Sequence, residues 1–530
     1  MPDTQHTPRV VVVTGDVTMD WLLARERNGP GQAAAWNPSG SARITWQRGG
    51  AALLADLVET LVPADGGWLI RQTGAPRAAV QPGDGRFHHA YTVWSPFEFR
   101  VGSRDKPAWR VEESLGLDRR LESEPAGWQQ VADDTPGPDL LVLDDANLGF
   151  RDSPALWPLA LLRSKVGSAY QALPLSSSAE PAGSAALGED APGRPWVVLK
   201  AAWPVAQGPL WERLQAHGAS RLIVVTTVDD LRRTEVQISR GLSWERTAQD
   251  VAWELVHNPR INTFARCAHV IVSFGAAGAL LCSRPEGAAH TFTLVYDPAV
   301  LEGEWEQGYP GHMLGYTTCL AAGIVRQILL AVEQPDIRRG VHAGLAALRR
   351  LHQEGYGIRG AVPSQARLGF PHALIAAALA EPGGLAEAPV QDPLRFLMYI
   401  ATPGDGSREE GYWTILRDRY AGSLAPVARQ IVLEGADGAL QGVPLGRFGG
   451  LLTVDRREIE SFRSVRALVA EYSRQGRGKK PLSIAVFGAP GSGKSFGITQ
   501  VARSLLPGQI EVLEFNLSQM ASPGDLTAAL

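Results

Sequence analysis

Short apolar runs alternate with amphipathic segments from residue 9 to residue 275, and this alternation predicts an α/β domain. The apolar runs carry no polar face, which is typical of strands in a parallel sheet that helices cover on both sides. The predicted strands are 9–16, 139–147, 195–201, 221–230 and 269–275, and the predicted helices are 51–62, 209–218 and 246–256.

Two of the predicted strands end in paired carboxylates. Asp144 and Asp145 close one strand, and Asp229 and Asp230 close another. Because ligands bind beyond the carboxyl ends of strands in open α/β sheets, these acids are placed for a binding site. Aspartate is also a frequent helix N-cap after a strand, so capping is the alternative role of each pair and the more frequent one.

Changes of pattern divide the chain into several parts. Residues 172–194 are rich in Ala, Ser, Pro and Gly without periodicity and are expected to form a mobile loop, while 381–393 has the composition of an interdomain linker. Helical spacing follows in 412–435, and 447–472 predicts a strand and then a helix whose start has a capping-box pattern, Asp455 and Glu458. We predict four parts: a first domain, 1–345, with a lid-like insertion near 66–120; a helical tail and linker, 346–392; a helical connector, 393–480; and a final module, 481–530.

The most specific motif lies in the final module. The apolar run 484–487 predicts a buried strand, and a glycine-rich turn that ends in a lysine and a serine leads from it into a helix. In such a P-loop, backbone N–H groups bind phosphate, the lysine contacts the β- and γ-phosphates, and the serine hydroxyl binds Mg²⁺. We therefore predict that ATP and Mg²⁺ are held by Gly488, Ala489, Pro490, Gly491, Ser492, Gly493, Lys494 and Ser495. A glycine turn that binds nothing would explain the glycines but not the lysine and serine at this spacing.

Composition and charge narrow the class of protein. The chain has 530 residues, of which 45% are hydrophobic and 20% charged, so it can bury several cores. A net charge of −4 gives no strong nucleic-acid signal, and no apolar run reaches the roughly 18 residues of a membrane span. Cys267, Cys282 and Cys319 lie far apart without metal-site spacing, so we expect buried free thiols in a cytoplasmic protein.

Roughly residues 9–345 resemble the ribokinase-like (PfkB) carbohydrate kinases. The resemblance lies in the opening strand with Asp16 and Asp20, the Gly-Gly helix start in 48–58, the strand and turn in 269–281, and the segment 311–325, which matches the family's Gly-Ala-Gly-Asp motif. It implies a parallel-sheet domain with a lid, a nucleotide beside 269–281, and Asp16 and Asp20 as candidate ligand contacts.

The matching segment departs from the family at the residues that do the chemistry. In the family, the Asp of this motif is the general base and the preceding glycines form an anion hole, whereas the matching residues here are Met313 and Leu314. Leu54 stands where the family has an Asn that contacts the sugar. We therefore expect a pseudokinase domain, and an active sugar kinase with rewired residues is the alternative.

The segment 87–116 matches the family's lid and mixes aromatic with basic side chains. Trp94, Trp109 and Arg110 are candidate ligand contacts, because aromatic rings stack on bases and sugars and a neighbouring arginine can hold a phosphate. The alternative is an amphipathic lid sheet that closes the first domain.

The P-loop, the helix after it and the segment 510–520 resemble the start of an AAA+ ATPase. Such an ATPase needs a further strand that ends in an acid, a Walker B motif, and Glu511, Glu514 and Asp525 do not follow a strand of that kind. We therefore expect this chain to be part of a longer ATPase that hydrolyses ATP poorly or not at all by itself.

These observations lead to one preferred function and two alternatives. We expect an ATP-binding regulatory or sensor AAA+-type ATPase whose inactive sugar-kinase-like domain binds a small molecule or a protein, and which forms a homo-oligomer in its full-length form. One alternative is a carbohydrate or nucleoside kinase with an attached regulatory P-loop module. The other is a non-catalytic interaction scaffold.

Overall fold

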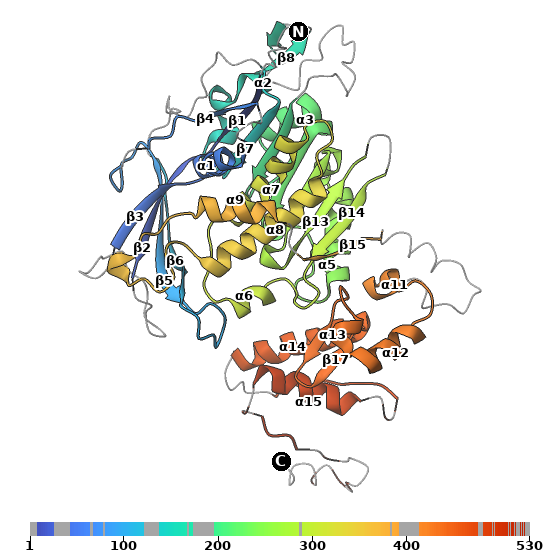
Figure 1. Ribbon diagram of the computed structural model, residues 1–530. Coiled ribbons are helices and arrows are strands. Elements are labelled where there is room, and N and C mark those ends of the chain that lie inside the picture. Colours follow the sequence, from blue (N-terminus) through green and yellow to red (C-terminus); the bar gives the residue numbers. More distant parts are fainter. Residues whose placement is uncertain are drawn as a thin grey trace. The chain divides into compact units, whose positions relative to one another are not determined.

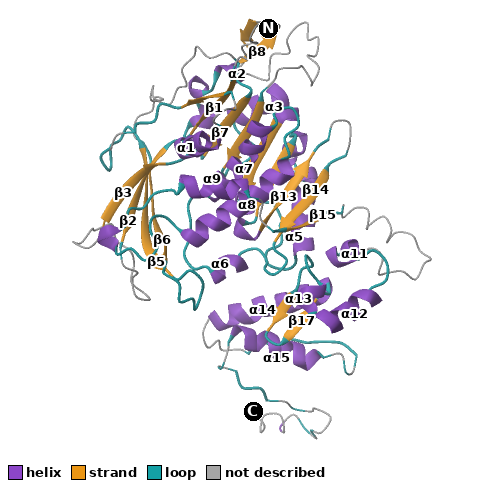
Figure 2. Cartoon of the chain, viewed as in Figure 1, coloured by secondary structure: helices purple, strands orange, loops and turns teal. Residues whose placement is uncertain are grey.

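The computed structural model divides into two compact units (Figures 1 and 2). The larger unit comprises 1–240 and 244–442, and the smaller comprises 241–243 and 443–530. The structure describes residues 8–25, 43–63, 67–77, 80–120, 137–166, 169–172, 195–285, 289–381, 384–391, 413–474, 481–489, 491, 493–506, 508, 510–513, 515, 520, 522 and 524.

A nine-stranded sheet forms the centre of the larger unit, in the order β15-β14-β13-β12-β11-β10-β7-β1-β4. The strands from β4 to β12 in this order are parallel to their neighbours, whereas β13, β14 and β15 are antiparallel additions at one edge. The strands are β1 Arg9–Gly15, β4 Trp68–Gln72, β7 Leu140–Asp145, β10 Trp196–Ala201, β11 Leu222–Thr227, β12 His269–Ser273, β13 Gly278–Ser283, β14 Thr291–Tyr296 and β15 Ala386–Pro389. Every residue of β7 is buried, as the lack of a polar face in its sequence predicts. The predicted α/β class with a largely parallel sheet is confirmed.

The helices of the larger unit include all three that the spacing predicts. They are α1 Ala51–Leu61, α2 Leu159–Leu162, α3 Pro209–Gly218, α4 Val228–Arg232, α5 Trp244–His257, α6 Glu304–Gly308, α7 Tyr316–Leu330, α8 Ile337–Glu354, α9 His372–Ala380, α11 Ile415–Arg419, α12 Ala425–Glu434 and α13 Ala436–Ala439. Helices α1, α7, α8 and α9 pack against one another. A short hairpin, β8 Arg163–Val166 and β9 Ala169–Ala172, completes the unit. The loop predicted for 172–194 lies outside the described residues except for its first residue.

The predicted end of the first domain at residue 345 is wrong, because this position lies inside helix α8. Helix α8 packs on α7 so closely that a Cβ on Gly323 would lie 2.5 Å from the carbonyl oxygen of Gly340. The residues after 345, including α9 and the edge strand β15, thus belong to the same unit. The sequence change at 381–393 misled the prediction, because part of this segment is strand β15 rather than a linker.

A second sheet has the order β3-β2-β5-β6, and we call it the lid sheet. Its strands are β2 Thr18–Ala24, β3 Arg43–Arg48, β5 His88–Phe97 and β6 Ala108–Asp118. It differs from the predicted insertion near 66–120 in two ways. Strands β2 and β3 precede that insertion, and β4, which lies within it, pairs with β1 in the large sheet. The arrangement of one largely parallel sheet and one lid sheet is consistent with the ribokinase-like fold that the resemblance implies.

The smaller unit consists of a two-stranded sheet and two helices in its described part. Strands β16 Gly446–Phe448 and β17 Leu451–Thr453 form a hairpin, followed by α14 Arg456–Arg474 and α15 Lys494–Leu505. The predicted strand-then-helix segment is confirmed, and the backbone N–H of Glu458 donates to Asp455 as the capping prediction requires. The predicted strand at 484–487 is wrong, because these residues pair with no strand within the described part of the chain, and Phe487 is 92% exposed.

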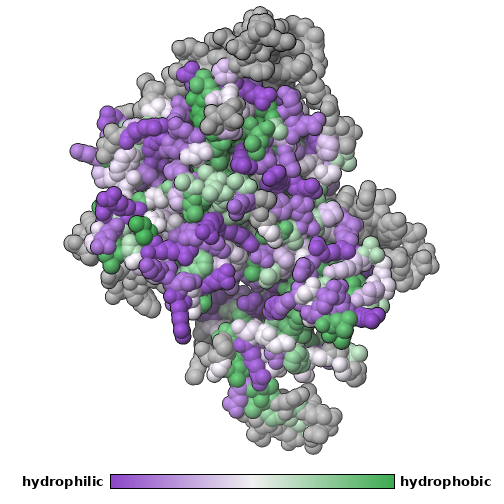
Figure 3. Space-filling model, in the orientation of Figure 1, coloured by the Kyte–Doolittle hydropathy of each residue, from purple (hydrophilic) through white to green (hydrophobic). Residues whose placement is uncertain are grey.

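The described residues were considered for a helix that could span a membrane, and their surface for apolar patches. Among the described residues, no helix combines the length and the apolar character that crossing a membrane requires. On the face drawn in Figure 3, hydrophobic side chains occur in small groups between hydrophilic ones. This mixed surface is normal for globular proteins.

Candidate functional site

The candidate site is built at the carboxyl ends of strands β1, β7 and β10. Asp16 directly follows β1, and its backbone N–H donates to the carbonyl oxygen of Asp144 at 2.8 Å. The pairing register sets Gly15 and Lys200 on either side of Asp144. A Cβ on Gly15 would lie 2.1 Å from the carbonyl oxygen of Asp144, so only glycine allows the two strands to approach in this way.

Asp16 is held by the loop that follows β7. Its carboxylate accepts hydrogen bonds from the backbone N–H groups of Ala146, Leu148 and Phe150 at 2.9, 3.0 and 3.0 Å. The side chain is only 1% exposed. Burial raises the pKa of Asp16 to about 7, although the N–H groups of Leu148 and Phe150 act in the opposite direction. Asp16 therefore changes its charge near neutral pH.

Asp144 has one carboxylate oxygen in use and one without a partner. The ammonium group of Lys200 donates to Oδ2 at 2.7 Å. Oδ1 is buried and has no hydrogen-bond partner among the described residues. A buried carboxylate oxygen of this kind costs free energy unless something donates to it. It is thus available to accept a hydrogen bond or a proton from a ligand hydroxyl.

Asp145 and Asp20 border this group on two sides. Arg151 donates its Nε–H to Asp145 at 2.9 Å, and burial raises the pKa of Asp145 while this arginine lowers it. Asp20, on lid strand β2, accepts a hydrogen bond from the hydroxyl of Thr18 at 2.6 Å. Burial raises the pKa of Asp20 as well, and the charges of Lys200 and Asp144 also act on it. Asp16, Asp20, Asp144 and Lys200 therefore form one electrostatically connected group.

The predicted capping role is wrong for the second pair of strand-end acids, because Asp229 and Asp230 lie in the first turn of helix α4 and neither is its N-cap. Thr227 is the N-cap of α4, and its hydroxyl accepts the backbone N–H of Asp230 and donates to the Asp230 carboxylate. Asp229 pairs with Arg232 and Arg240 at the surface. These two acids take no part in the group around Asp144.

The start of helix α7 carries no acid. Its N-cap is Gly315 and its first residue is Tyr316, so this residue, rather than Met313 or Leu314, stands at the helix N-terminus. His352 donates its Nε2–H to the carbonyl of Tyr309 at 2.8 Å, which leaves Nδ1 to accept the hydroxyl proton of Tyr316. Burial raises the pKa of Tyr316 well above its ordinary value and lowers that of His352 to about 3. Neither group is a proton acceptor for a ligand in this arrangement.

The aromatic and basic residues of the lid segment lie inside the protein. Trp94, Trp109 and Arg110 are each 0% exposed. Trp94 stacks on Tyr356, with ring centroids 4.3 Å apart, and Arg110 donates to backbone carbonyl groups. This burial agrees with the alternative of a closing lid sheet. A contact between these residues and a ligand stays a prediction.

The P-loop lies at the start of α15 in the smaller unit. The Lys494 ammonium donates to the carbonyl oxygens of Gly488 and Ala489, both at 2.6 Å. Gly491 and Gly493 have φ angles of +78° and +76°, which residues other than glycine rarely adopt. Gly493 is the N-cap of the helix. Pro490 and Ser492 lie outside the described residues. Across the described chain, no group of three or more His, Cys, Asp or Glu residues could hold a metal.

The sequence prediction missed Lys200 and Arg151. Lys200 interrupts the apolar strand Trp196–Ala201, and a lone charge in a strand buried on both faces was the available signal. Arg151 gave no such signal, because it lies in a short 3-10 helix outside the sheet. Only the register of β10 against β7 shows that Lys200 neighbours Asp144.

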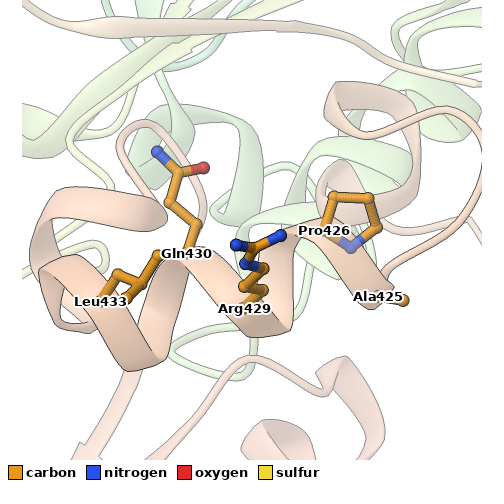
Figure 4. A pocket seen from close by; sticks show the side chains of 5 residues that line it. All are labelled: Ala425, Pro426, Arg429, Gln430 and Leu433. Atoms are coloured by element: carbon orange, nitrogen blue, oxygen red, sulfur yellow. The ribbon is translucent and has the colours of Figure 1, made fainter.

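Two surface pockets lie away from this group. One, of about 410 Å³, lies along helix α12 and is lined by Ala425, Pro426, Arg429, Gln430 and Leu433 (Figure 4). The other, of about 540 Å³, lies beside α5 and the edge strands and includes Trp253, His257 and Phe292. Neither contains a residue of the Asp144 group.

No protein-family model and no curated protein matches this chain. Ribokinase from Cryptococcus neoformans in complex with ADP is 13% identical, with a TM-score of 0.35, over 69% of this chain and 98% of that one. Ribokinase from Thermotoga maritima is 12% identical, with a TM-score of 0.34, over 71% of this chain and all of that one. Ribokinase from Arabidopsis thaliana with ribose and ATP is 12% identical, with a TM-score of 0.34, over 71% and 100% of the two chains.

These similar structures correct the preferred function. The expectation of an AAA+-type regulatory ATPase with an inactive kinase domain is wrong, because the similar solved structures are sugar and nucleoside kinases of the ribokinase type. The chain is thus similar to ribokinases in fold.

Proposed function

We propose that the larger unit binds an uncharged sugar or nucleoside at the Asp144 group and transfers a phosphoryl group to it from ATP. The observation that carries this proposal is the buried Oδ1 of Asp144, which has no partner among the described residues, beside an ammonium group 2.7 Å from the other oxygen. A hydroxyl group is the natural donor for such an oxygen. An anionic ligand would meet Asp16, Asp20, Asp144 and Asp145 together.

The chemistry divides between two side chains of the chain itself. Oδ1 of Asp144 takes the proton from the ligand hydroxyl, whose oxygen then bonds to the γ-phosphorus of ATP as ADP leaves. Lys200 holds Asp144 in place, because its ammonium donates to Oδ2. Since residues 311–316 contain no acid, Asp144 supplies the base from a strand end instead of a helix start.

The test is phosphoryl transfer from radiolabelled ATP to a panel of neutral sugars and nucleosides. The assay uses the full chain with Lys494→Ala, so that the P-loop does not consume ATP. We expect at least one labelled product, and a loss of about 10²-fold in rate with Asp144→Asn, since removing a general base costs 10²–10⁴-fold. Asp229→Asn, a surface acid outside the group, is the matched control and keeps the rate. The proposal would be refuted if no compound of the panel became labelled, or if Asp144→Asn kept full activity.

We further propose that the smaller unit is a regulatory module that binds ATP with Mg²⁺ through its P-loop. Support comes from Lys494, whose ammonium already lies against the carbonyls of the loop, and from the positive φ angles of Gly491 and Gly493. Gly488 to Ser495 would cradle the phosphates, with Ser495 providing a hydroxyl for Mg²⁺. A homo-oligomer of the full-length protein stays a prediction.

Titration calorimetry of the full chain with Mg-ATP tests this module. Lys494→Ala is expected to weaken one binding event by about 100-fold, because it removes a charge-assisted contact to the triphosphate worth roughly 1.5–3 kcal/mol. Arg503→Ala, an exposed cation in the last turn of the same helix, should leave the isotherm unchanged. Equal binding by wild type and Lys494→Ala would exclude a nucleotide at this loop.

A further inference from the structure

The lid sheet is fastened to the core of the larger unit by strand β6. The backbone N–H of Tyr356 donates to the carbonyl of Trp109 at 3.0 Å, and that of Gly360 donates to Pro107 at 2.9 Å. Val111 and His312 exchange both of their backbone hydrogen bonds, at 3.0 and 2.9 Å. Thus β6 is bonded on one side to β5 and on the other to the segments after α8 and before α7.

Arg110 lies at the centre of this joint. Its guanidinium donates to the carbonyl oxygens of His352 at 2.7 Å, Pro310 at 2.6 Å, and Glu98 and Phe99 at 3.1 Å each. These carbonyls belong to the end of α8, the loop before α7 and the loop after β5. The side chain is 0% exposed, and these four hydrogen bonds all go to backbone carbonyl oxygens. Burial lowers the pKa of Arg110 to about 10, so it still carries its charge at neutral pH.

Close packing leaves the joint no room to slide. Gly355 has a φ of +71°, and a Cβ there would lie 2.3 Å from the carbonyl oxygen of Trp109. A Cβ on Gly311 would lie 2.8 Å from Cβ of Arg110. Trp94 and Tyr356, both 0% exposed, stack between lid and core with ring centroids 4.3 Å apart. Opening the lid would expose these two rings and leave a buried charge and several carbonyls without partners.

We propose that Arg110 locks the lid sheet onto the core of the larger unit, so that the lid is a fixed wall and not a gate. The same lock positions the loop that enters α7, because Pro310 and His312 are bonded to two consecutive residues of β6. A site with a fixed wall is assembled before its ligand arrives, and this avoids the cost of ordering a lid on binding. The inference concerns how the lid is fastened and does not depend on the proposed phosphoryl transfer.

Hydrogen exchange measured by mass spectrometry on the full chain tests the lock. In the wild type, the amides of 109–111 and those of Tyr356 and Gly360, whose N–H groups bond to the lid, are expected to exchange as slowly as those of the core strand β11. Adding D-ribose with Mg-ATP should leave these rates unchanged. Arg110→Ala should speed exchange in both segments by roughly tenfold or more while β11 keeps its rate, because local opening no longer breaks the four bonds of the guanidinium.

The matched control is Arg104→Ala, an exposed arginine in the turn between β5 and β6, which should change nothing. The proposal would be overturned by a gating lid. Such a lid would show wild-type amides in 109–111 that exchange tenfold or more faster than those of β11, and whose exchange slows when D-ribose and Mg-ATP are added. Unchanged exchange in Arg110→Ala would overturn it too. If Arg110→Ala does not fold, Arg110→Lys replaces it, because lysine keeps the charge but cannot span the carbonyls that the planar guanidinium joins.

Discussion

Lys200→Met is expected to lower the free energy of unfolding of the larger unit by about 3 kcal/mol, because a buried carboxylate loses its partner. Asp144 is 1% exposed, and Lys200 is the cation that donates to it, at 2.7 Å. Methionine has nearly the length of lysine and packs well among apolar neighbours, so the change removes the charge with little loss of volume. The remaining carboxylate of Asp144 is then buried without its ion pair.

Urea unfolding followed by tryptophan fluorescence measures this effect in the larger unit alone, since all 15 tryptophans lie outside 241–243 and 443–530. The double variant Lys200→Met/Asp144→Leu should recover most of the loss, because it removes the uncompensated charge as well. Lys106→Met, at an exposed lysine near the β5–β6 turn, is the matched control and should stay within about 0.5 kcal/mol of wild type. A Lys200→Met variant as stable as this control would contradict the proposed burial of the pair.

The pattern of apolar runs predicted the central sheet well, because strands buried on both faces leave a strong signature. Strands β1, β7, β10, β11 and β12 all lie within their predicted segments. The antiparallel edge of the sheet was not predicted. Strand β15 has only four residues, and its pairing with β14 comes from a segment 90 or more positions later in the chain. Such a contact leaves no local trace in the sequence.

The candidate site was predictable only in part, for the same reason. Asp16 and Asp144 follow directly from the rule that ligands bind at the carboxyl ends of parallel strands. Lys200 is in the right place only because β10 pairs with β7 in one register, and a shift of one residue would turn it to the other face of the sheet. The contacts of Arg110 could not be predicted for the same kind of reason, since its carbonyl partners at 98, 99, 310 and 352 are mostly distant in sequence.

The P-loop shows the opposite case, in which a local motif was clear and its context was not. The loop glycines, Lys494 and the helix after it have the predicted order, and Lys494 contacts two loop carbonyls. The apolar run 484–487 needs neighbouring strands before it can become part of a sheet, and none pairs with it in the described part of the smaller unit. Apolar character therefore predicted the strand, but strand formation depends on partners that the run itself does not specify.

A dependence of stability on pH is expected from Asp16, whose pKa burial raises to about 7 from an ordinary value of 3.8. Between these two values the folded protein holds a proton that the unfolded chain releases, so folding is favoured at low pH and stability falls as the pH rises from about 4 to about 7. Between pH 5 and pH 8 this single group should lower the free energy of unfolding of the larger unit by on the order of 3 kcal/mol, given 1.36 kcal/mol for each unit of pKa difference.

The urea midpoint of the tryptophan signal, measured at intervals from pH 5 to pH 8, isolates this contribution when wild type is compared with Asp16→Asn. Asparagine does not titrate, so the stability of Asp16→Asn should fall less steeply with pH over this range. At pH 5 the variant should be less stable than wild type, because an asparagine amide can accept fewer of the hydrogen bonds from Ala146, Leu148 and Phe150. Asp229→Asn, at the surface, should keep the wild-type slope. Parallel curves for wild type and Asp16→Asn would mean that Asp16 is ionised throughout. In that case the three N–H groups, rather than burial, would set the charge of Asp16.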